Sequence, residues 1–198
     1  MTLSLQKILS VFQDNNYIVS AKVLKDNGFD RYQVEQYLQD EILLKVGYGL
    51  YCLKDNVPDE FSMIQSRSEK IIFSHSTALY LLGMSDRVPG VFNVTIPQGY
   101  NVTKIKRDFD NIDFNYSKAD WWSLGVSKVA TPQGFEVSVY DKERSILDII
   151  RNKSKVDYQI YIQAIKEYFS TQKNFRKILK YSKVMNLEDK VRMYIEMI

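Results

Sequence analysis

The chain has 198 residues, of which 45% are hydrophobic and 26% are charged, and its formal net charge is +3. This composition is typical of a globular protein, and no apolar run is long enough for a membrane-spanning helix. The single cysteine, Cys52, excludes an internal disulfide and favours a reducing compartment. Since the N-terminus lacks a signal-peptide pattern, we expect a cytoplasmic protein with no membrane partner.

The charges are distributed unevenly along the chain. Residues 1–56 carry six Lys and Arg against seven Asp and Glu, and residues 57–150 carry ten against twelve. Residues 151–198 carry eleven against five. Attraction to nucleic acid is therefore expected from the C-terminal end. A solvated, lysine-rich helical surface would explain the same surplus.

Residues 1–56 have the element order of a winged helix-turn-helix. Apolar residues recur at helical spacing over residues 3–13 and are followed by a short extended segment. Ser20 is a suitable N-cap for a short second helix, and Asn27-Gly28 provides the left-handed residue that ends it. Asp30, with Gln33 three residues later, predicts a capping box at the start of a third helix.

The third helix is expected to be the reading helix of this module. Its Val34, Tyr37 and Leu38 recur at i, i+3 and i+4 and should face the core. Helix-turn-helix proteins reach base edges with the first turns of such a helix. The candidates for major-groove contacts are therefore Arg31, Tyr32, Gln33 and Gln36.

A β-hairpin over residues 43–53 follows, with a tight turn at Gly47-Tyr48-Gly49. It would act as the wing beside the reading helix. Together with the start of the second helix, it supplies the candidates for phosphate contacts, which are Ser20, Lys22, Lys45 and Tyr48. The alternative is a small helical module that only packs against the rest of the chain.

A polar run ending in Pro58 predicts a boundary between a winged helix-turn-helix domain, residues 1–56, and a second domain, residues 57–198. The second domain is expected to be mixed α/β with a small sheet. Its predicted strands cover residues 71–73, 92–96 and 112–116, and residues 125–130 and 135–140 are predicted to form a hairpin. Its first helices are predicted to cover residues 59–69 and 77–82. Residues 104–109 fit either a short helix or a loop.

The C-terminal end is predicted to be helical, so the fold class is α+β. Asp141 caps a helix over residues 143–151, and further helices cover residues 158–169, 175–181 and 187–198. A basic patch on this end would contact the DNA backbone, and its candidate members are Lys173, Arg176, Lys177, Lys180 and Lys183.

Several blocks of the sequence resemble AbiEi-type antitoxins of type IV toxin–antitoxin systems. The first block is Gly-Tyr-Gly-Leu-Tyr-Cys-Leu at residues 47–53, at the end of the predicted wing. The second, Phe-Ser-His-Ser-Thr-Ala-Leu-Tyr-Leu-Leu-Gly-Met at residues 73–84, is followed by Asp-Arg-Val-Pro at 86–89 and the strand at 92–96. The third is Val-Ser-Val-Tyr-Asp-Lys-Glu-Arg-Ser-Ile-Leu-Asp at residues 137–148. Together these blocks span most of the chain in the order found in the family.

The resemblance implies an antitoxin that acts in abortive infection against phage. Its N-terminal domain would bind inverted repeats in double-stranded DNA at its own promoter and repress transcription. Its C-terminal domain would counter a nucleotidyltransferase-like toxin without forming a stable complex. A winged-helix transcription factor whose second domain senses a ligand or a protein, with no toxin partner, is the alternative.

Enzymatic readings are weaker, and we expect neither catalysis nor a metal or cofactor. His75 is the only histidine, and its one possible thiol partner, Cys52, lies in the other predicted domain. Asp108, Asp110 and Asp113 are the best carboxylate cluster for a Mg²⁺ ion, but their stretch is polar and turn-like. Trp121-Trp122 fits a core role or a stacking platform.

Overall fold

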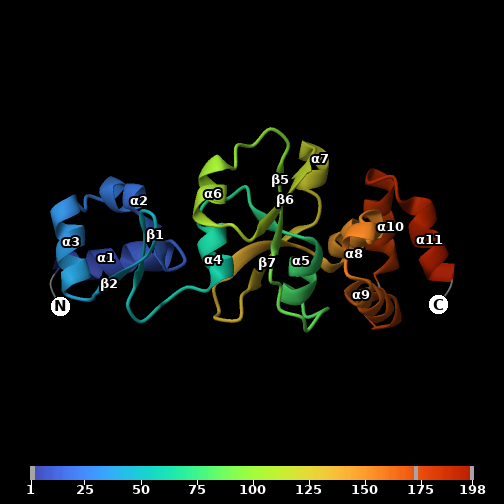
Figure 1. Cartoon of the computed structure of the whole chain (residues 1–198), viewed down its shortest axis with the longest axis horizontal. Coiled ribbons are helices and arrows are strands. Elements are labelled where there is room, and N and C mark those ends of the chain that lie inside the picture. The colour runs from blue at the N-terminus through green and yellow to red at the C-terminus, as the bar shows by residue number, and fades with distance from the viewer. Residues whose placement is uncertain (1–2, 172–173, 197–198) are drawn as a thin grey trace. The chain divides into compact units, whose positions relative to one another are not determined.

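The computed structural model describes residues 3–171 and 174–196 of the chain (Figure 1). It is an α+β protein with small sheets and a helical C-terminal end, as the sequence predicted. Two compact units divide the chain: unit 1 comprises residues 1–68 and 130–136, and unit 2 comprises residues 69–129 and 137–198. No helix in the described part is both long and apolar enough to cross a membrane.

Unit 1 contains a three-stranded antiparallel sheet of order β1-β3-β2. Ile18 pairs with Cys52, and Leu43 pairs with Leu53, so β3 is the central strand. The elements of this unit are α1 (Leu3–Asp14), β1 (Ile18–Ser20), α2 (Ala21–Asp26), α3 (Arg31–Gln39), β2 (Leu43–Gly47), β3 (Leu50–Leu53) and α4 (Glu60–Gln65).

The core of unit 1 follows from the helical spacing of α1. Ile8 and Phe12 are fully buried and pack with Leu24 of α2 and Val34 of α3. The sheet contributes Leu43, so the three helices and the sheet share one hydrophobic core. This sharing explains why α2 and α3, which are too short to be stable alone, keep their helical form.

Unit 1 extends past residue 56, where the sequence predicted the boundary. Arg67, which follows α4, donates a hydrogen bond from Nη1 to the carbonyl oxygen of Tyr48, at 3.0 Å. Residues 130–136 also belong to this unit. Asn16 donates to the backbone oxygen of Glu136 at 2.9 Å, and Tyr17 packs edge-to-face on Phe135. These long-range contacts have no local signature in the sequence.

Unit 2 is built on a five-stranded mixed sheet of order β6-β5-β4-β8-β7. β5 pairs in parallel with β6 and antiparallel with β4, and β4 pairs in parallel with β8. The buried residues of β4, β5 and β8 are mostly β-branched or aromatic, which favours strands. The strands are β4 (Ile72–Phe73), β5 (Phe92–Pro97), β6 (Ile112–Ser117), β7 (Val126–Ala130) and β8 (Glu136–Tyr140).

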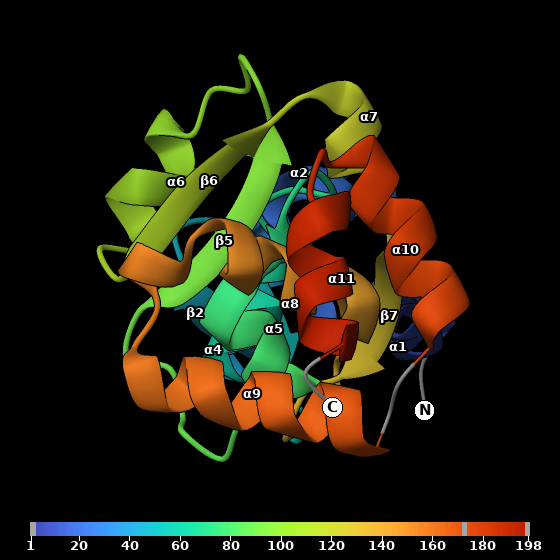
Figure 2. The same cartoon turned by 90° about the vertical axis from the view of Figure 1, so that its right-hand side faces the viewer.

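Three helices of unit 2, α5, α6 and α7, lie between strands in the chain, and α7 was not predicted from the sequence. α6 settles the ambiguous stretch 104–109 as helix, and α7 forms around Trp121-Trp122, for which no helix was predicted. Figure 2 shows α9 running across the direction of α10 and α11. The helices are α5 (His75–Leu81), α6 (Thr103–Asp108), α7 (Ala119–Trp122), α8 (Lys142–Arg151), the 3₁₀ turn η1 (Lys153–Lys155), α9 (Tyr158–Thr171), α10 (Phe175–Val184) and α11 (Glu188–Glu196).

Helix α8 carries a buried ion pair within unit 2. Arg144 Nε lies 3.0 Å from Asp148 Oδ1, and the two side chains are only 3% and 5% exposed. The Arg144 guanidinium also donates to the backbone oxygens of Trp121 and Leu124 and lies 4.0 Å from the centre of the Tyr140 ring. One buried cation therefore links α8 to α7 and β8.

The chain approaches this ion pair closely at Gly125. Its φ is +76°, and a Cβ atom there would lie 2.8 Å from Cβ of Arg144. Any side chain would therefore displace α8, besides being strained by the backbone conformation. The glycine allows the backbone that accepts from Arg144 to pass directly over the helix start.

We predict that Asp148→Asn destabilises unit 2 by about 3–5 kcal/mol, because it leaves the Arg144 charge buried without its carboxylate. Urea unfolding followed by tryptophan fluorescence measures this, since both tryptophans lie in unit 2. Glu188→Gln is the control: it breaks the exposed pair with Arg192, at 2.7 Å, and should cost less than about 1 kcal/mol. Equal losses in the two variants would contradict a supporting role for the buried pair.

Candidate nucleic-acid interface

The segment from α2 to α3 has the caps that the sequence predicted. Ser20 Oγ accepts a hydrogen bond from the backbone nitrogen of Val23, and Gly28 has a φ of +85° after the end of α2. Asp30 Oδ1 accepts from the nitrogen of Gln33, and Gln33 Oε1 accepts from the nitrogen of Asp30. Together these bonds fix the turn between α2 and α3 and the direction in which α3 begins.

The capping box limits what Gln33 can do. Its carboxamide oxygen is held at the helix start and its side chain is half-buried. The same holds in part for Ser20, whose hydroxyl oxygen is occupied but whose hydrogen is free to donate. The structure therefore places Ser20 as the cap of α2 and Gln33 as part of the capping box of α3, rather than as freely exposed contact residues.

The outer face of α3, defined here as Tyr32 and Gln36, is exposed to solvent. Val34 is buried, and Tyr37 and Leu38 pack against the core of unit 1, as their spacing predicted. The opposite side therefore faces outward: Tyr32 is 69% exposed, and Gln36 Nε2 donates to its hydroxyl at 3.1 Å. This pair presents an aromatic ring, a hydroxyl and a carboxamide in one place.

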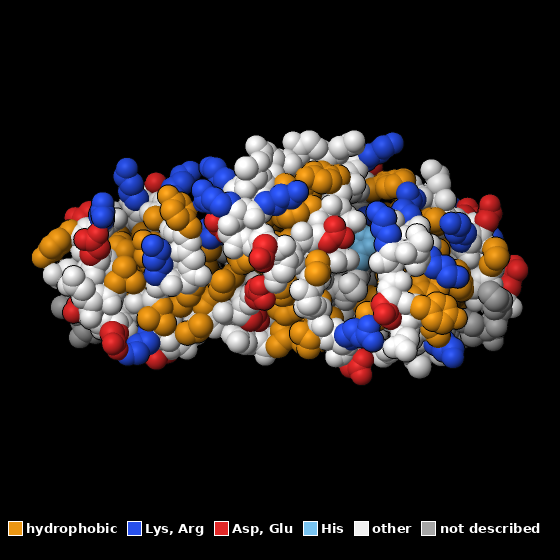
Figure 3. Space-filling model, in the orientation of Figure 1, with side chains coloured by type: hydrophobic (Ala, Val, Ile, Leu, Met, Phe, Trp, Pro, Cys, Tyr) orange, Lys and Arg blue, Asp and Glu red, His pale blue; other side chains and the backbone are white. Residues whose placement is uncertain are grey.

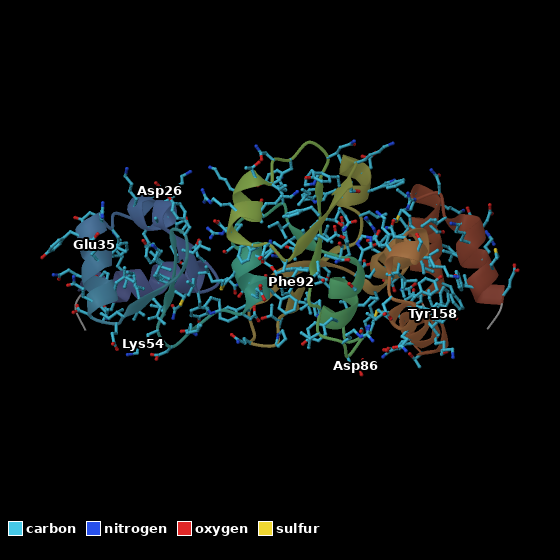
Figure 4. All side chains as sticks on the ribbon, in the orientation of Figure 1. Asp26, Glu35, Lys54, Asp86, Phe92 and Tyr158 are labelled. Atoms are coloured by element: carbon cyan, nitrogen blue, oxygen red, sulfur yellow. The ribbon has the colours of Figure 1, made fainter. Side chains whose placement is uncertain are left out.

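Arg31 lies at the first turn of α3 and is 92% exposed. Its Nε donates to Glu35 Oε1 at 2.8 Å, and this contact raises the pKa of the guanidinium. An exposed pair of this kind contributes little to stability, so the guanidinium can exchange its partner at small cost. Figure 4 labels Glu35 on α3.

The hairpin β2–β3 presents Lys45 and Tyr48 to solvent, and Tyr48 is 73% exposed. Its turn is supported by Arg67, whose bond to the Tyr48 carbonyl is described above. A Cβ atom on Gly47 would lie 3.1 Å from Arg67 Nη2, so the guanidinium packs closely along the turn. Arg67 could not be predicted as a support of the hairpin, because nothing in its local sequence connects it with a turn about twenty residues earlier.

A hollow of about 690 Å³ opens between α2, α3 and the hairpin. Lys25, Arg31 and Lys45 line it, together with the acidic Asp30 and Glu35. Its charges are thus mixed, in agreement with the balanced charge of residues 1–56. Lys22 of α2 is exposed but does not line this hollow.

The predicted basic patch is only partly available. Lys177 Nζ lies 3.1 Å from Asp141 Oδ2 and 2.9 Å from Glu143 Oε2, so its charge is neutralised at the start of α8. Burial lowers the pKa of Lys177, but the bonds to Glu143 and Asp141 outweigh burial and raise it. Lys183 lies 3.9 Å from Glu188. Arg176 and Lys180 are exposed on α10, and Lys173 lies outside the described residues.

The candidates for catalysis are not brought together. Cys52 is buried in β3 of unit 1, where burial raises the pKa of its thiol, and His75 belongs to unit 2. Asp108 pairs with Arg107, and Asp110 and Asp113 are exposed. Among the described residues, no group of three or more His, Cys, Asp or Glu side chains is placed to hold a metal ion.

Of the two roles that the sequence left open for Trp121 and Trp122, the contacts favour packing within unit 2. Both are half-buried, and each indole nitrogen donates to a backbone oxygen, Trp121 to Val184 at 3.0 Å and Trp122 to Lys70 at 3.2 Å. Their rings also contact cations within unit 2, since Arg151 lies 4.1 Å from the centre of the Trp121 ring. They therefore support unit 2 and offer no open stacking platform.

His75 is buried at the start of α5 and is held by polar neighbours. Its Nδ1 lies 3.0 Å from Ser74 Oγ, and its Nε2 lies 2.9 Å from Asn152 Nδ2. Asn152 Nδ2 also donates to the carbonyl oxygen of Asp148, which fixes the amide orientation. Since Nε2 must then accept, the imidazole is neutral and carries its proton on Nδ1.

This arrangement makes the charge state of His75 part of the fold. Burial is the main cause that lowers the pKa of His75; the carboxylate of Asp148 opposes this, and Arg144 adds to it. A protonated ring would place an N–H against the Asn152 donor. Ser74 and His75 therefore form a structural polar cluster, which Thr95 completes by donating to Ser74 Oγ at 2.9 Å.

We predict that His75 makes unit 2 acid-sensitive. Because its pKa is lower in the folded than in the unfolded chain, where it is about 6.5, the stabilisation is complete above that pH and is lost as the pH falls below it. The free energy of unfolding should therefore fall between pH 7 and 5.5 more steeply in the parent chain than in His75→Gln, by at most about 1.4 kcal/mol per pH unit. Identical pH slopes in urea titrations would contradict this.

Comparisons with known proteins agree with the fold but give no function. No family model matches the chain, and no curated protein is significantly similar to it. Among solved structures, the RV2827C protein from Mycobacterium tuberculosis is similar, with a TM-score of 0.55 and 12% sequence identity. The match covers 90% of this chain and 70% of the mycobacterial chain. At this identity, the likeness concerns the fold alone.

Proposed function

We propose that unit 1 is a winged helix that binds double-stranded DNA, and that the chain is an AbiEi-type antitoxin that represses its own operon. The observation that carries the DNA-binding proposal is the exposed outer face of α3, fixed by caps and followed directly by the hairpin β2–β3. A helix held in this way, with polar side chains at its first turns, has the dimensions and chemistry that fit the major groove.

In this proposal, the outer face of α3 and Arg31 contact base edges. Gln36 offers a carboxamide that can pair bidentately with adenine, and Arg31 can leave Glu35 to pair with guanine. Lys22, Lys45 and Tyr48 contact phosphates, and the Ser20 hydroxyl donates to one. Gln33 serves chiefly to hold the start of α3, as its capping bonds indicate.

The electrostatic part of binding is modest. Residues 1–56 carry no positive surplus, so base contacts and shape must contribute much of the preference for the operator. Additional phosphate contacts are assigned to Arg176 and Lys180 of α10, with smaller contributions from cations that already have carboxylate partners, such as Lys177. We therefore expect a weaker salt dependence than a strongly basic repressor shows.

The antitoxin part of the proposal rests on the sequence resemblance. Unit 2 would counter a nucleotidyltransferase-like toxin in the cytoplasm without a stable complex, and without catalysis by this chain. A nucleotidyltransferase reading frame beside this gene, together with growth rescue on co-expression, would support it. Two results would contradict it: the absence of growth rescue, or rescue that depends on a stable complex with the toxin in a pull-down.

A second candidate is a winged-helix transcription factor whose unit 2 senses a ligand, with no toxin partner. The observation that favours it is a cleft of about 850 Å³ in unit 2, whose size suits a small molecule. The two candidates share the DNA-binding proposal and differ in what unit 2 does.

We predict that the full chain shifts an inverted repeat upstream of its own gene, and that Gln36→Ala weakens this binding by about 1–3 kcal/mol, with little change on random DNA. A mobility-shift titration of both DNAs measures it. Gln13→Ala removes a matched carboxamide from an exposed position of α1 and should leave both affinities unchanged. If the parent chain has no preference for the repeat over random DNA at low salt, the proposed reading face is wrong.

We also predict that Lys45→Ala weakens binding to all DNA sequences and lowers the slope of log affinity against log salt by about 1, because one phosphate contact is lost. Lys54→Ala is the matched control, since this lysine follows β3 and is paired with Glu41. An unchanged salt slope in Lys45→Ala would show that Lys45 makes no phosphate contact and would contradict the placement of the hairpin in the DNA interface.

A further inference from the structure

A second concave surface lies entirely within unit 2, where the end of α8, the turn η1, the start of α9 and helix α11 meet. Its volume of about 850 Å³ is within the range of small-molecule sites. Figure 3 shows hydrophobic side chains between Lys and Arg side chains over these C-terminal helices. We call it the α8–α11 cleft.

Three cations line the cleft, Arg151, Lys153 and Lys190, and no acidic residue does. This differs from other cations in unit 2, since Arg144, Lys177 and Arg192 each have a carboxylate within 3.1 Å. In the described part of the chain, none of the three cleft cations forms an ion pair. The cleft is therefore positive and lacks an anion of its own.

Arg151 is the lining cation whose contacts the structure defines most fully. Its guanidinium donates to the backbone oxygen of Met185 and stacks on Trp121, which fixes its plane. Its Nε is buried without a hydrogen-bond partner among the described residues. Burial is the main cause that lowers the pKa of Arg151; the charge of Asp148 opposes this, and the charge of Arg144 adds to it.

Aromatic side chains form the other part of the lining. Tyr158, at the start of α9, is 71% exposed (Figure 4). Tyr161 lies deeper, hydrogen-bonded to the hydroxyl of Tyr194, with Lys153 Nζ 5.2 Å from its ring centre. An exposed ring beside cations that have no carboxylate partner within the residues that the structure describes suits a ligand that combines a planar π-system with negative charge.

We propose that the α8–α11 cleft binds a nucleoside phosphate. The base stacks on Tyr158 and the neighbouring apolar lining, and the phosphates are bound by Lys153, Lys190 and the guanidinium of Arg151. Three cations match a ligand with more negative charge than a single carboxylate carries. The exposed ring matches a ligand that also has a planar group, which a bare phosphate lacks. The inference does not depend on the proposed DNA binding, because none of its residues belongs to unit 1.

The ligand would connect parts of unit 2 that are distant in the sequence. Lys153 and Tyr158 lie at the turn after α8, whereas Lys190 lies on α11. Binding would therefore hold α11 against η1 and α9. A nucleotide signal would in this way act directly on the C-terminal helices.

Calorimetric titration of the full chain with ATP, GTP, CTP and UTP tests the proposal, with adenosine and tripolyphosphate as probes of the two halves of the ligand. We expect a dissociation constant on the order of 10 μM for at least one nucleotide, and binding at least about tenfold weaker for adenosine and for tripolyphosphate. Lys153→Ala with Lys190→Ala should weaken nucleotide binding by at least about tenfold. Tyr158→Ala should weaken it by about fivefold or more and leave tripolyphosphate unaffected.

The matched control is Lys155→Ala with Lys166→Ala, which removes the same charge from exposed positions of η1 and α9 outside the cleft lining. It should leave nucleotide binding unchanged. The proposal is overturned if no nucleotide binds at about 1 mM, or if both double variants lose affinity equally. It is also overturned if tripolyphosphate binds as tightly as ATP, or if poly-glutamate displaces the nucleotide at equal charge, which would indicate a simple anion site or an acidic-peptide groove.

Discussion

The buried ion pair of Arg144 and Asp148 is the constraint on which unit 2 depends. Removing two charges from water is unfavourable, and the cost is offset only when the remaining hydrogen-bonding groups are also satisfied. Arg144 meets this condition through the backbone oxygens at the end of α7 and the face of Tyr140, whereas Asp148 Oδ2 is buried without a hydrogen-bond partner among the described residues. Since these partners come from α7 and β8, the pair can be buried only when helix and sheet are correctly placed. It therefore selects one arrangement of unit 2 among many that would bury similar apolar area.

Both ends of helix α8 are also held by polar contacts with other elements of unit 2. At its start, Asp141 and Glu143 hold Lys177 of α10, and at its end Asn152 holds the neutral ring of His75 at the start of α5. Its polar residues thus connect the sheet to the C-terminal helices, while Ile146, Leu147 and Ile150 fill the core between them. The α8–α11 cleft opens where this helix ends, so the proposed ligand site includes residues of a helix that is held at both ends by polar contacts.

Local features of the fold could be predicted from the sequence, because each depends on neighbours a few residues away. The caps at Ser20, Asp30 and Asp141 are of this kind, as is the inward side of α3. The sheet order of unit 2 was beyond such reasoning, since β4 has two residues and its partners β5 and β8 are far apart in the chain. The burial of Arg144 and Asp148 was missed for another reason: charged residues at i and i+4 are normally exposed. The outer face of α3 was predictable from periodicity, whereas Arg67 and the α8–α11 cleft depend on tertiary contacts.

The second segment of unit 1 has a consequence for how the molecule is made. Because residues 130–136 belong to unit 1, the chain passes from one unit to the other after residues 68, 129 and 136. Unit 1 is thus discontinuous, and a ribosome that has released only the first 68 residues has not supplied Phe135 to pack on Tyr17. The α3 surface becomes part of a complete unit only after most of the sheet of unit 2 has been synthesised. Complete folding of unit 1 in a nascent or prematurely ended chain is thereby disfavoured, and the two units mature together instead of in succession.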